Sequence, residues 1–372
     1  MPVSEEINLI ISLLALLVGL FMFWTFPVIK TIDKNGQLFP LLSIIIPARN
    51  EAGRISPLLR SLQEQHYQSF EVLVVDDHST DQTAAIARSF GAKVLQNKAV
   101  DSGSGKSKAC WHGAQHAKGQ WLLFLDADAS FTDAESLFKI LGCYHRKGAK
   151  GILSLQPFHT VHRLYENLSA IFNIIVIVGM NVFTFWGPSF KAAGSFGPCM
   201  ICNKGDYFST GGHYKILGAV MDDLALGQAF MDKSLPVYCI GGNGVINFRM
   251  YPEGLRSLVE GWCKSFAVGS KSTHPIVMAM TILWITGSFM STGVLIASIS
   301  ALHPVAMVLS GLLYAAYAFQ TMRFAHRCGN FNRWIFLFYP LLFLFFSAIH
   351  LYSLFRAHVL HTVSWKGRKI DV

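Results

Sequence analysis

The chain has 372 residues, of which 52% are hydrophobic and only 14% charged, and its mean hydropathy is +0.39. This composition is too apolar for an ordinary soluble enzyme and predicts a membrane protein. The net charge of +9 favours anionic lipid head groups or phosphate-bearing substrates, whereas the scattered basic residues argue against nucleic acid as a partner. The seven dispersed cysteines, including the lone pair Cys199 and Cys202, predict reduced thiols rather than disulfides or a zinc site.

The first predicted element is the uncharged apolar run Ile7–Val28. At about 1.5 Å per residue, a helix of this length crosses the roughly 30 Å of a bilayer's hydrocarbon core. Acidic residues precede the run and lysines follow it, which is the reverse of a signal peptide. We therefore predict that residues 1–30 form a retained transmembrane anchor and that the following domain faces the cytoplasm.

Short apolar strands alternate with amphipathic segments after the anchor. This alternation is typical of a parallel α/β sheet, which binds ligands at the carboxyl ends of its strands. We expect strands at Leu42–Ile46, Glu71–Val75, Lys93–Gln96 and Trp121–Leu125, with helices at Ile55–Gln65, Ala84–Phe90 and Lys108–Ala117. Polar clusters follow the strands, so the predicted site lies at that edge of the sheet.

The strand Trp121–Leu125 runs into Asp126, Ala127 and Asp128. Side chains alternate along extended chain, so the two carboxylates point the same way and repel each other unless a cation bridges them. Hard oxygen ligands at a strand end suit Mg²⁺ or Mn²⁺, which would also hold phosphates. Asp126 and Asp128 are therefore candidate metal ligands, and a solvated turn is the alternative.

Two further polar clusters are candidates for binding a nucleotide. Asp76 and Asp77 end a strand, where a carboxylate accepts hydrogen bonds from a base or ribose, and capping of the next helix by Asp77 is the alternative. Gly103–Ser107 does not match the phosphate-loop pattern, because Val100 stands where that pattern needs glycine. A flexible loop that carries Lys106 to the nucleotide and a plain surface loop both remain open.

The later apolar segments pose a problem of membrane topology. Residues 168–190 could cross a bilayer, but one crossing would put the candidate site residues on opposite sides, so we expect an interfacial helix or a buried core helix. Residues 251–271 predict another interfacial helix, and 275–356 contain three apolar spans, Pro275–Ile299, Pro304–Phe324 and Trp334–Phe355. Three crossings would place the basic tail 357–372 outside. Either one span is re-entrant or the tail is an exception, and we favour a cytoplasmic tail.

Four motifs in fixed order, IIIPARNE, VVDDHSTDQT, GSGKSKA and FLDADA, resemble the nucleotide-sugar-binding half of family 2 glycosyltransferases. The resemblance covers residues 43–269 and continues through GSFGPCMI at Gly194 and MDDLALG at Met221. It implies a GT-A fold, a Rossmann-like α/β domain with a mostly parallel sheet, for residues 41–250 between the N-terminal and C-terminal transmembrane helices. RMYPEG at Arg249 and VSWKGR at Val363 resemble the carotenoid-type members of the family.

The resemblance also implies roles for particular residues. Asp223 would be the general base with Asp222 beside it, and the alternative is a helix N-terminus, which favours acidic residues. Asp126 and Asp128 would hold Mn²⁺ or Mg²⁺. The nucleotide sugar would contact Pro47, Glu51, Asp76, Asp77, Lys106, Asp126 and Gly197. The candidate diphosphate contacts are Arg249, Lys264, Trp365 and Arg368, although Arg249 and Lys264 could equally be basic residues that snorkel at a membrane surface.

The resemblance implies an inverting enzyme that transfers a single sugar, because the Q-x-x-R-W motif of processive members is replaced over Trp262–Phe266. The expected enzyme is a multi-pass protein of the cell membrane. Its expected donor is a UDP-sugar, with glucose as the sugar, and its expected acceptor is the carboxylate of a C30 carotenoid drawn from the lipid bilayer. The alternatives are another lipid acceptor (diacylglycerol, a sphingolipid or polyprenyl phosphate) and, more remotely, a non-catalytic membrane scaffold. The sequence makes no prediction of the oligomeric state.

Overall fold

The computed structural model describes residues 3–29, 38–97, 105–269, 272–359, 362–365 and 368–371. The chain divides into two compact units. We call Pro27–Thr160 together with Ala192–Met250 the sheet unit, and Met1–Phe26 together with Val161–Lys191 and Tyr251–Val372 the helical unit.

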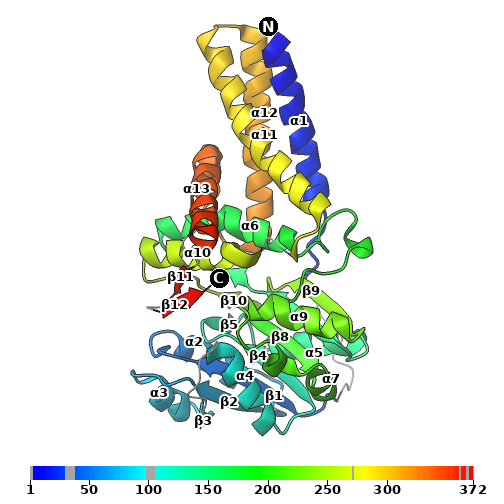
Figure 1. Ribbon diagram of the computed structural model, residues 1–372, viewed down its shortest axis with the longest axis vertical. Helices are drawn as coiled ribbons and strands as arrows, with labels where there is room; N and C mark the ends of the chain where they lie inside the picture. The colour runs from blue at the N-terminus through cyan, green and yellow to red at the C-terminus, as the bar shows by residue number, and fades with distance from the viewer. Residues whose placement is uncertain are drawn as a thin grey trace. The chain divides into compact units, whose positions relative to one another are not determined.

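The sheet unit contains a seven-stranded sheet with the order β3-β2-β1-β4-β8-β6-β9 (Figure 1). Its strands are β1 (Leu42–Ala48), β2 (Phe70–Asp76), β3 (Lys93–Gln96), β4 (Trp121–Leu125), β6 (Ile152–Gln156), β8 (Cys199–Asn203) and β9 (Val237–Gly241). Neighbouring strands are parallel except at β8, which is antiparallel to β4 and β6. A second sheet has the order β5-β10-β7, with β5 (Ala129–Phe131), β7 (Phe158–His159) and β10 (Ile246–Phe248). The mostly parallel α/β fold confirms the prediction.

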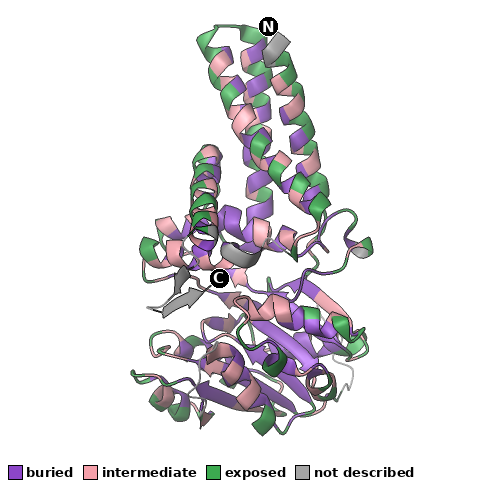
Figure 2. Cartoon of the chain, viewed as in Figure 1, coloured by how far each residue is buried: buried purple, intermediate pink, exposed green. Residues whose placement is uncertain are grey.

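Side chains alternate along the strands of the large sheet, so apolar side chains lie on both of its faces. Helices cover both faces and bury these side chains. Ile44 and Ile46 of β1 face the core shared with α2 and α5, whereas Ile45 faces the core shared with α4 and α9. Buried residues accordingly run through the strands in Figure 2. The helices of this unit are α2 (Ile55–Gln63), α3 (Thr83–Ser89), α4 (Gly105–His116), α5 (Ser136–Arg146), α7 (Lys204–Ser209), α8 (Gly212–Lys215) and α9 (Asp222–Asp232).

The helical unit is built from long apolar helices. Its elements are α1 (Val3–Met22), η1 (Leu164–Ser169), α6 (Ala170–Gly179), η2 (Gly187–Ser189), α10 (Leu255–Gly269), α11 (Pro275–Ser300), α12 (Pro304–Cys328), η4 (Arg333–Phe338), α13 (Tyr339–His358) and the hairpin β11 (Thr362–Trp365) and β12 (Arg368–Asp371). Within the described residues, three helical stretches are long and apolar enough to cross a membrane, namely Pro275–Ser300, Pro304–Cys328 and Arg333–Ala357. These three stretches are compatible with membrane association.

Helix α1 packs beside α11 and α12 through polar contacts as well as apolar ones (Figure 1). The side-chain amide of Gln320 donates to the carbonyl oxygen of Leu16 at 2.8 Å and accepts from the indole N–H of Trp284 at 2.8 Å. The hydroxyl of Tyr317 donates to the carbonyl oxygen of Ser12 at 3.1 Å. Because buried polar groups are costly without partners, these bonds fix how the three helices face one another.

Two predicted helices are shorter than expected. Helix α1 ends at Met22 and does not reach Val28, because Pro27 disfavours helix at the residue before it and Val28 forms a bridge with Gly241. The range 168–190 is not one helix, since α6 ends at Gly179 and Asn181 adopts a positive φ of 70°. At about 1.5 Å per residue, the ten residues of α6 span about 15 Å, so this helix is too short to cross a bilayer.

We expect Gly113→Ala to destabilise the protein by roughly 1–3 kcal/mol, because the core under α4 has no room for another methyl group. A Cβ atom at Gly113 would lie 2.6 Å from Cγ2 of Ile45 and 3.0 Å from Cγ2 of Val75. The measurement is the unfolding temperature of the purified full-length protein in detergent. Gly53→Ala is the matched control, since nothing lies within 4 Å of an added Cβ there. Equal unfolding temperatures for the two variants would contradict this account.

Candidate active site

Polar residues gather where four neighbouring parallel strands end. The strands β3, β2, β1 and β4 share one carboxyl edge, as the expected fold requires. The residues that directly follow them include Arg49, Asn50, Glu51, Asp77, Asn97 and Asp126. The sheet thus brings together residues that lie up to 77 positions apart in sequence, as Arg49 and Asp126 do.

Asp77 is the centre of the first part of the site. Its side chain is buried, accepts a hydrogen bond from Nδ2 of Asn97 at 2.8 Å and lies 3.6 Å from a guanidinium nitrogen of Arg49. A Cβ atom at Gly105 would lie 2.0 Å from Oδ2 of Asp77, so only glycine permits the start of α4 to come this close. The carboxylate of Asp81, not that of Asp77, accepts from the backbone N–H of Thr83 at the start of α3.

The loop after β1 is tied to the loop after β2. Glu51 pairs with Nε of Arg54 at 2.9 Å, and its backbone N–H donates to Oγ1 of Thr83 at 2.8 Å. Asn50, at a positive φ of 53°, accepts through its side chain from the backbone N–H of Thr80. Pro47 lies in β1 opposite Val75, and buried Asp76 accepts from the backbone N–H of Ser79. These bonds hold both loops in place around Asp77.

Lys106 connects the first part of the site to the DxD carboxylates, which are those of Asp126 and Asp128. Its Nζ lies 2.7 Å from Oδ1 of Asp126, and the lysine side chain is 32% exposed. Burial by itself lowers the pKa of Lys106, but the carboxylates of Asp126 and Asp222 outweigh it and raise that pKa well above its usual value. The expectation that Lys106 sits on a flexible loop is wrong, because the packing of Gly105 against Asp77 places Lys106 in the first turn of α4.

Asp128 is a carboxyl group in an unfavourable place for a negative charge. Burial and the neighbouring carboxylate of Asp126 raise its pKa from 3.8 to about 6, while Arg54 and Lys106 act in the opposite direction. The backbone N–H of Asp126 donates to the carbonyl oxygen of Pro198 at 3.0 Å, so this pair of carboxylates is anchored to the segment before β8. The mutual repulsion is the one expected from the spacing of the two aspartates.

Asp222 and Asp223 begin α9 and form the second acidic pair. Burial and the charge of Asp222 raise the pKa of Asp223 from 3.8 to about 6, although Lys106 lowers it. The hydroxyl of Ser195 donates to the carbonyl oxygen of Asp223 at 2.7 Å. A Cβ atom at Gly197 would lie 3.0 Å from Oδ2 of Asp223, so the segment around Gly197 lies directly against the carboxylate. The two acidic pairs therefore share the field of Lys106.

Four candidate residues are not placed at this cluster by the structure. Arg249 follows β10 in the sheet unit, and Lys264 lies in α10 of the helical unit. Trp365 and Arg368 lie on β11 and β12, and their side chains are outside the described residues. A role of these four residues in diphosphate binding stays a prediction.

Other residues of the site carry little or no signal in the sequence. Asn97 and Arg54 belong to no motif; the only signal for Asn97 is its position just after a predicted strand, and the only signal for Arg54 is its position just before a predicted helix. The histidines His159 and His213 are both fully buried. His213 lies in α8, where its Nδ1 atom is 2.9 Å from the hydroxyl of Tyr207 and burial lowers its pKa to about 4. An apolar surrounding of this kind is not visible in the local sequence.

The DxD carboxylates fit a divalent cation that takes most of its ligands from a substrate. Within the described ranges, no group of three or more His, Cys, Asp or Glu side chains could hold a metal by itself. Asp126 and Asp128 provide two hard oxygen donors, and Mg²⁺ is commonly bound by one or two carboxylates together with substrate phosphates. A cation here would also relieve the repulsion that raises the pKa of Asp128.

Comparisons with known proteins agree with this arrangement. The model of the family described as "Glycosyl transferase family 2" matches residues 43–177. The chain is 40% identical over 346 residues, covering 92% of this chain and 91% of the other, to 4,4'-diaponeurosporenoate glycosyltransferase of Staphylococcus aureus strain MRSA252. It is 39% identical over 345 residues, with the same coverage, to the protein of that name from strain USA300.

Among solved structures, the fold is shared with mannosyltransferase PcManGT from Pyrobaculum calidifontis, determined in complex with GDP-Man and Mn²⁺. The TM-score is 0.56 at 17% sequence identity, and the match covers 94% of this chain and 98% of that chain. This likeness shows that the two chains have the same architecture.

The raised pKa of Asp128 predicts a pH-dependent stability. An unfolded aspartate releases its proton near pH 3.8, whereas folded Asp128 keeps it until about pH 6, so this group makes the protein less stable as pH rises between these values. We expect Asp128→Asn to raise the unfolding temperature at pH 7 in EDTA by several degrees, with the difference vanishing toward pH 4.

Asp133→Asn is the control, because we expect it to change the stability at pH 7 in the opposite direction. Burial by itself raises the pKa of Asp133, but the bond to Lys139 outweighs it and lowers that pKa. The ionised carboxylate therefore stabilises the folded protein, and Asp133→Asn should reduce stability at pH 7. Thermal unfolding of the purified full-length protein at both pH values measures both effects. A lower unfolding temperature for Asp128→Asn than for the unchanged protein at pH 7 would contradict the expected strain at Asp128.

Proposed function

Because the chain belongs to glycosyltransferase family 2, we propose that it moves one sugar from a nucleotide-sugar donor to a lipophilic acceptor taken from the membrane. The observation that carries this proposal is the cluster around Lys106, a cation that lies next to Asp126 and shares the field of Asp222 at the carboxyl edge of the sheet. A site of this composition suits a diphosphate donor and an attacking oxygen.

In the proposal, Asp77 and Asn97 bind the nucleoside of the donor. A carboxylate held by an amide and an arginine is an acceptor for the N3–H of uracil or for ribose hydroxyls, which favours a UDP-sugar. Asp126 and Asp128 would hold Mn²⁺ or Mg²⁺, which stabilises the negative charge of the departing diphosphate. Lys106 lies next to Asp126 and supplies a second positive charge for the same phosphates.

Asp223 is the proposed general base. Burial raises the pKa of Asp223 to about 6, which is closer to the working pH. A base with such a pKa is mostly ionised and still accepts a proton readily. The acceptor oxygen forms a bond to the anomeric carbon while the bond from that carbon to the diphosphate breaks. Attack from the side opposite the diphosphate inverts the configuration; where the acceptor is a hydroxyl, its proton passes to Asp223, and a carboxylate acceptor has no proton to pass on.

The proposed acceptor is a C30 carotenoid acid, which would become a glucosyl ester. The support is the identity of 40%, spread over 92% of the chain, to enzymes named for 4,4'-diaponeurosporenoate. The apolar helices of the helical unit give an enzyme of this kind access to an acceptor that is dissolved in the bilayer. Transfer to diacylglycerol, a sphingolipid or polyprenyl phosphate is the alternative that the assay below separates.

The proposed topology places α1 (Val3–Met22) and residues 275–356 in the cell membrane, and the sheet unit, which begins at Pro27, in the cytoplasm. Four exposed aromatic residues of the helical unit, Phe21, Trp24, Phe185 and Trp186, pack against one another, as in the aromatic belts found at membrane interfaces. All seven cysteines are free thiols, as suits a reducing compartment. The segments 168–190 and 251–271 are proposed to lie at the interface.

The first test is transfer of labelled glucose from UDP-glucose to an organic-extractable product by the purified full-length enzyme with Mn²⁺. Parallel reactions contain diaponeurosporenoate or diacylglycerol. We expect label on the carotenoid acid, and a loss of at least about 100-fold with Asp128→Asn or EDTA, because the diphosphate then lacks its cation. Asp133→Asn should keep the activity. Label on diacylglycerol alone would overturn the acceptor, and equal activity of Asp128→Asn would overturn the metal site.

The second test compares acceptor types in Asp223→Asn. A carboxylate is ionised near pH 7 and has no proton to lose, so its glucosylation should fall only about tenfold. The polyene alcohol of the same length needs the base, and its glucosylation should fall by about 100-fold or more. Initial rates with the two acceptors give the ratio. An equally severe loss with both would contradict the proposed role of Asp223.

A further inference from the structure

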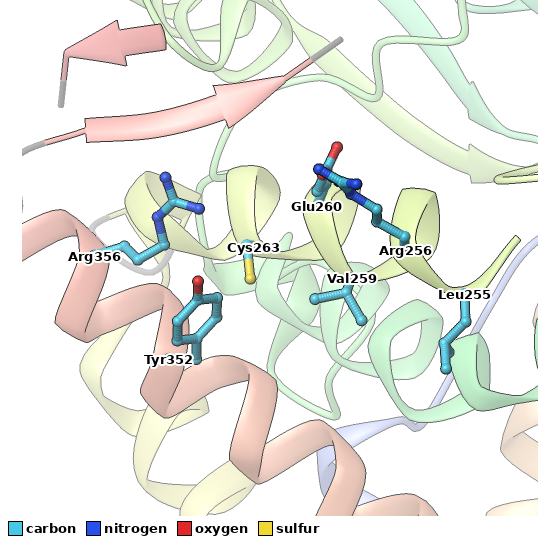
Figure 3. Close-up of a pocket in the computed structure, with 7 residues that line it drawn as sticks. All are labelled: Leu255, Arg256, Val259, Glu260, Cys263, Tyr352 and Arg356. Atoms are coloured by element: carbon cyan, nitrogen blue, oxygen red, sulfur yellow. Dashed lines mark hydrogen bonds and ion pairs between the residues drawn. The ribbon is translucent and has the colours of Figure 1, made fainter. Parts of the chain in front are cut away.

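The helical unit contains a cavity of about 520 Å³ that lies apart from the residues of the candidate active site in sequence. It is lined from α10 by Leu255, Arg256, Val259, Glu260 and Cys263, and from α13 by Tyr352 and Arg356 (Figure 3). The hydroxyl of Ser353 donates to the carbonyl oxygen of Cys263 at 2.6 Å, so the two helices that form its walls are fastened to each other. Its volume lies within the roughly 300–1,000 Å³ of ordinary ligand pockets.

The lining carries an excess of positive charge at Arg356. Arg256 is paired with Glu260 one turn away, with Nε and Oε1 3.0 Å apart. The guanidinium of Arg356 instead stacks over the ring of Tyr352, 5.8 Å from its centroid. Its Nε atom is buried and has no hydrogen-bond partner within the part of the chain that the structure describes. A buried N–H without a partner costs free energy, so this atom points to a ligand that accepts a hydrogen bond.

The other groups at the cavity limit what that ligand can be. Burial raises the pKa of the Cys263 thiol to about 11, so it is neutral and supplies no negative charge to Arg356. Leu255 and Val259 add apolar surface, and Tyr352 adds a phenol that can donate a hydrogen bond. The set suits an amphiphile with an anionic head and an apolar chain, since a guanidinium forms paired bonds with a carboxylate.

We propose that this cavity is a docking site where Arg356 and Tyr352 hold the carboxylate end of the acceptor before that carboxylate reaches the donor sugar. The inference rests on the proposed function, because it takes the acceptor to be a polyene acid. Within the described residues, Arg356 forms no ion pair with a carboxylate, so its guanidinium matches one negative charge. Arg356 and Tyr352 lie in the last two turns of a long apolar helix, where arginine and tyrosine commonly place their polar ends at the level of lipid head groups. An acid from the bilayer would reach them there.

The test measures binding without the donor, so that it does not depend on catalysis. Full-length protein in nanodiscs of phosphatidylcholine is titrated with diaponeurosporenoate and with its methyl ester, which has the same chain without the charge. We expect the unchanged protein to bind the acid at least about tenfold more tightly than the ester, as charge-assisted hydrogen bonds predict. Arg356→Gln should bind the two equally. Arg356→Lys, which keeps the charge, should retain part of the preference.

Arg333→Gln is the matched control, because Arg333 belongs to the same unit and also lies over an aromatic ring, that of Trp334, 5.8 Å from its centroid. This control should keep the preference for the acid. An undiminished preference in both Arg356 variants would overturn the assignment. So would displacement of the acid by phosphatidylglycerol in the unchanged protein but not in Arg356→Gln, which would make the cavity a phospholipid site.

Glucose transfer measured in parallel separates this inference from the proposed function. If binding of the acid depends on Arg356 but no sugar reaches it, the cavity assignment stands and the proposed acceptor reaction falls. If sugar is transferred while the acid binds equally well without Arg356, the proposed reaction stands and the cavity assignment falls.

Discussion

The site depends on the ammonium group of Lys106, which lies among carboxylates that repel one another. Parallel strands end at a common edge, and this fold therefore crowds acidic side chains that follow different strands into one region. Lys106 counters the crowding: its Nζ lies 2.7 Å from Asp126, and the charges of Asp126 and Asp222 raise its pKa. Two glycines let the backbone approach the same region, Gly105 at Asp77 and Gly197 at Asp223. The positions of α4 and α9 follow from these close approaches.

The strands β1 to β4 of the large sheet could be predicted, and the central ones, β1 and β4, are buried on both faces. The strands Lys93–Gln96 and Trp121–Leu125 have the expected bounds, and β1 and β2 differ only at their ends. A buried strand is a short apolar run between polar turns, which is a local pattern. The antiparallel direction of β8 is different, since its partners β4 and β6 come from distant parts of the chain. The local sequence of a strand does not determine whether it pairs in a parallel or an antiparallel direction.

The less predictable features come from tertiary packing. A glycine at the start of α4 counts against helix by propensity, but the contact of Gly105 with Asp77 requires it, so Lys106 is helical where a loop was expected. Asn97 reaches Asp77 only because β3 and β2 are neighbours. His213 resembles a surface histidine in sequence, yet its ring packs against Phe124 of β4, with the ring centroids 5.0 Å apart. Each case depends on a residue distant in the chain.

The chemistry of the acceptor decides whether the proposed reaction depends more on Asp223 or on Arg356. A hydroxyl acceptor must lose a proton, so it needs a base more than it needs a cation. A carboxylate acceptor has no proton to lose, but its charge must leave water for apolar surroundings, and that transfer is costly without a partner. It therefore needs a cation more than a base. Asp223, near pKa 6, and Arg356, with its buried Nε, correspond to these two needs. The buried Nε of Arg356, which has no hydrogen-bond partner among the described residues, is the feature that favours an acid over an alcohol.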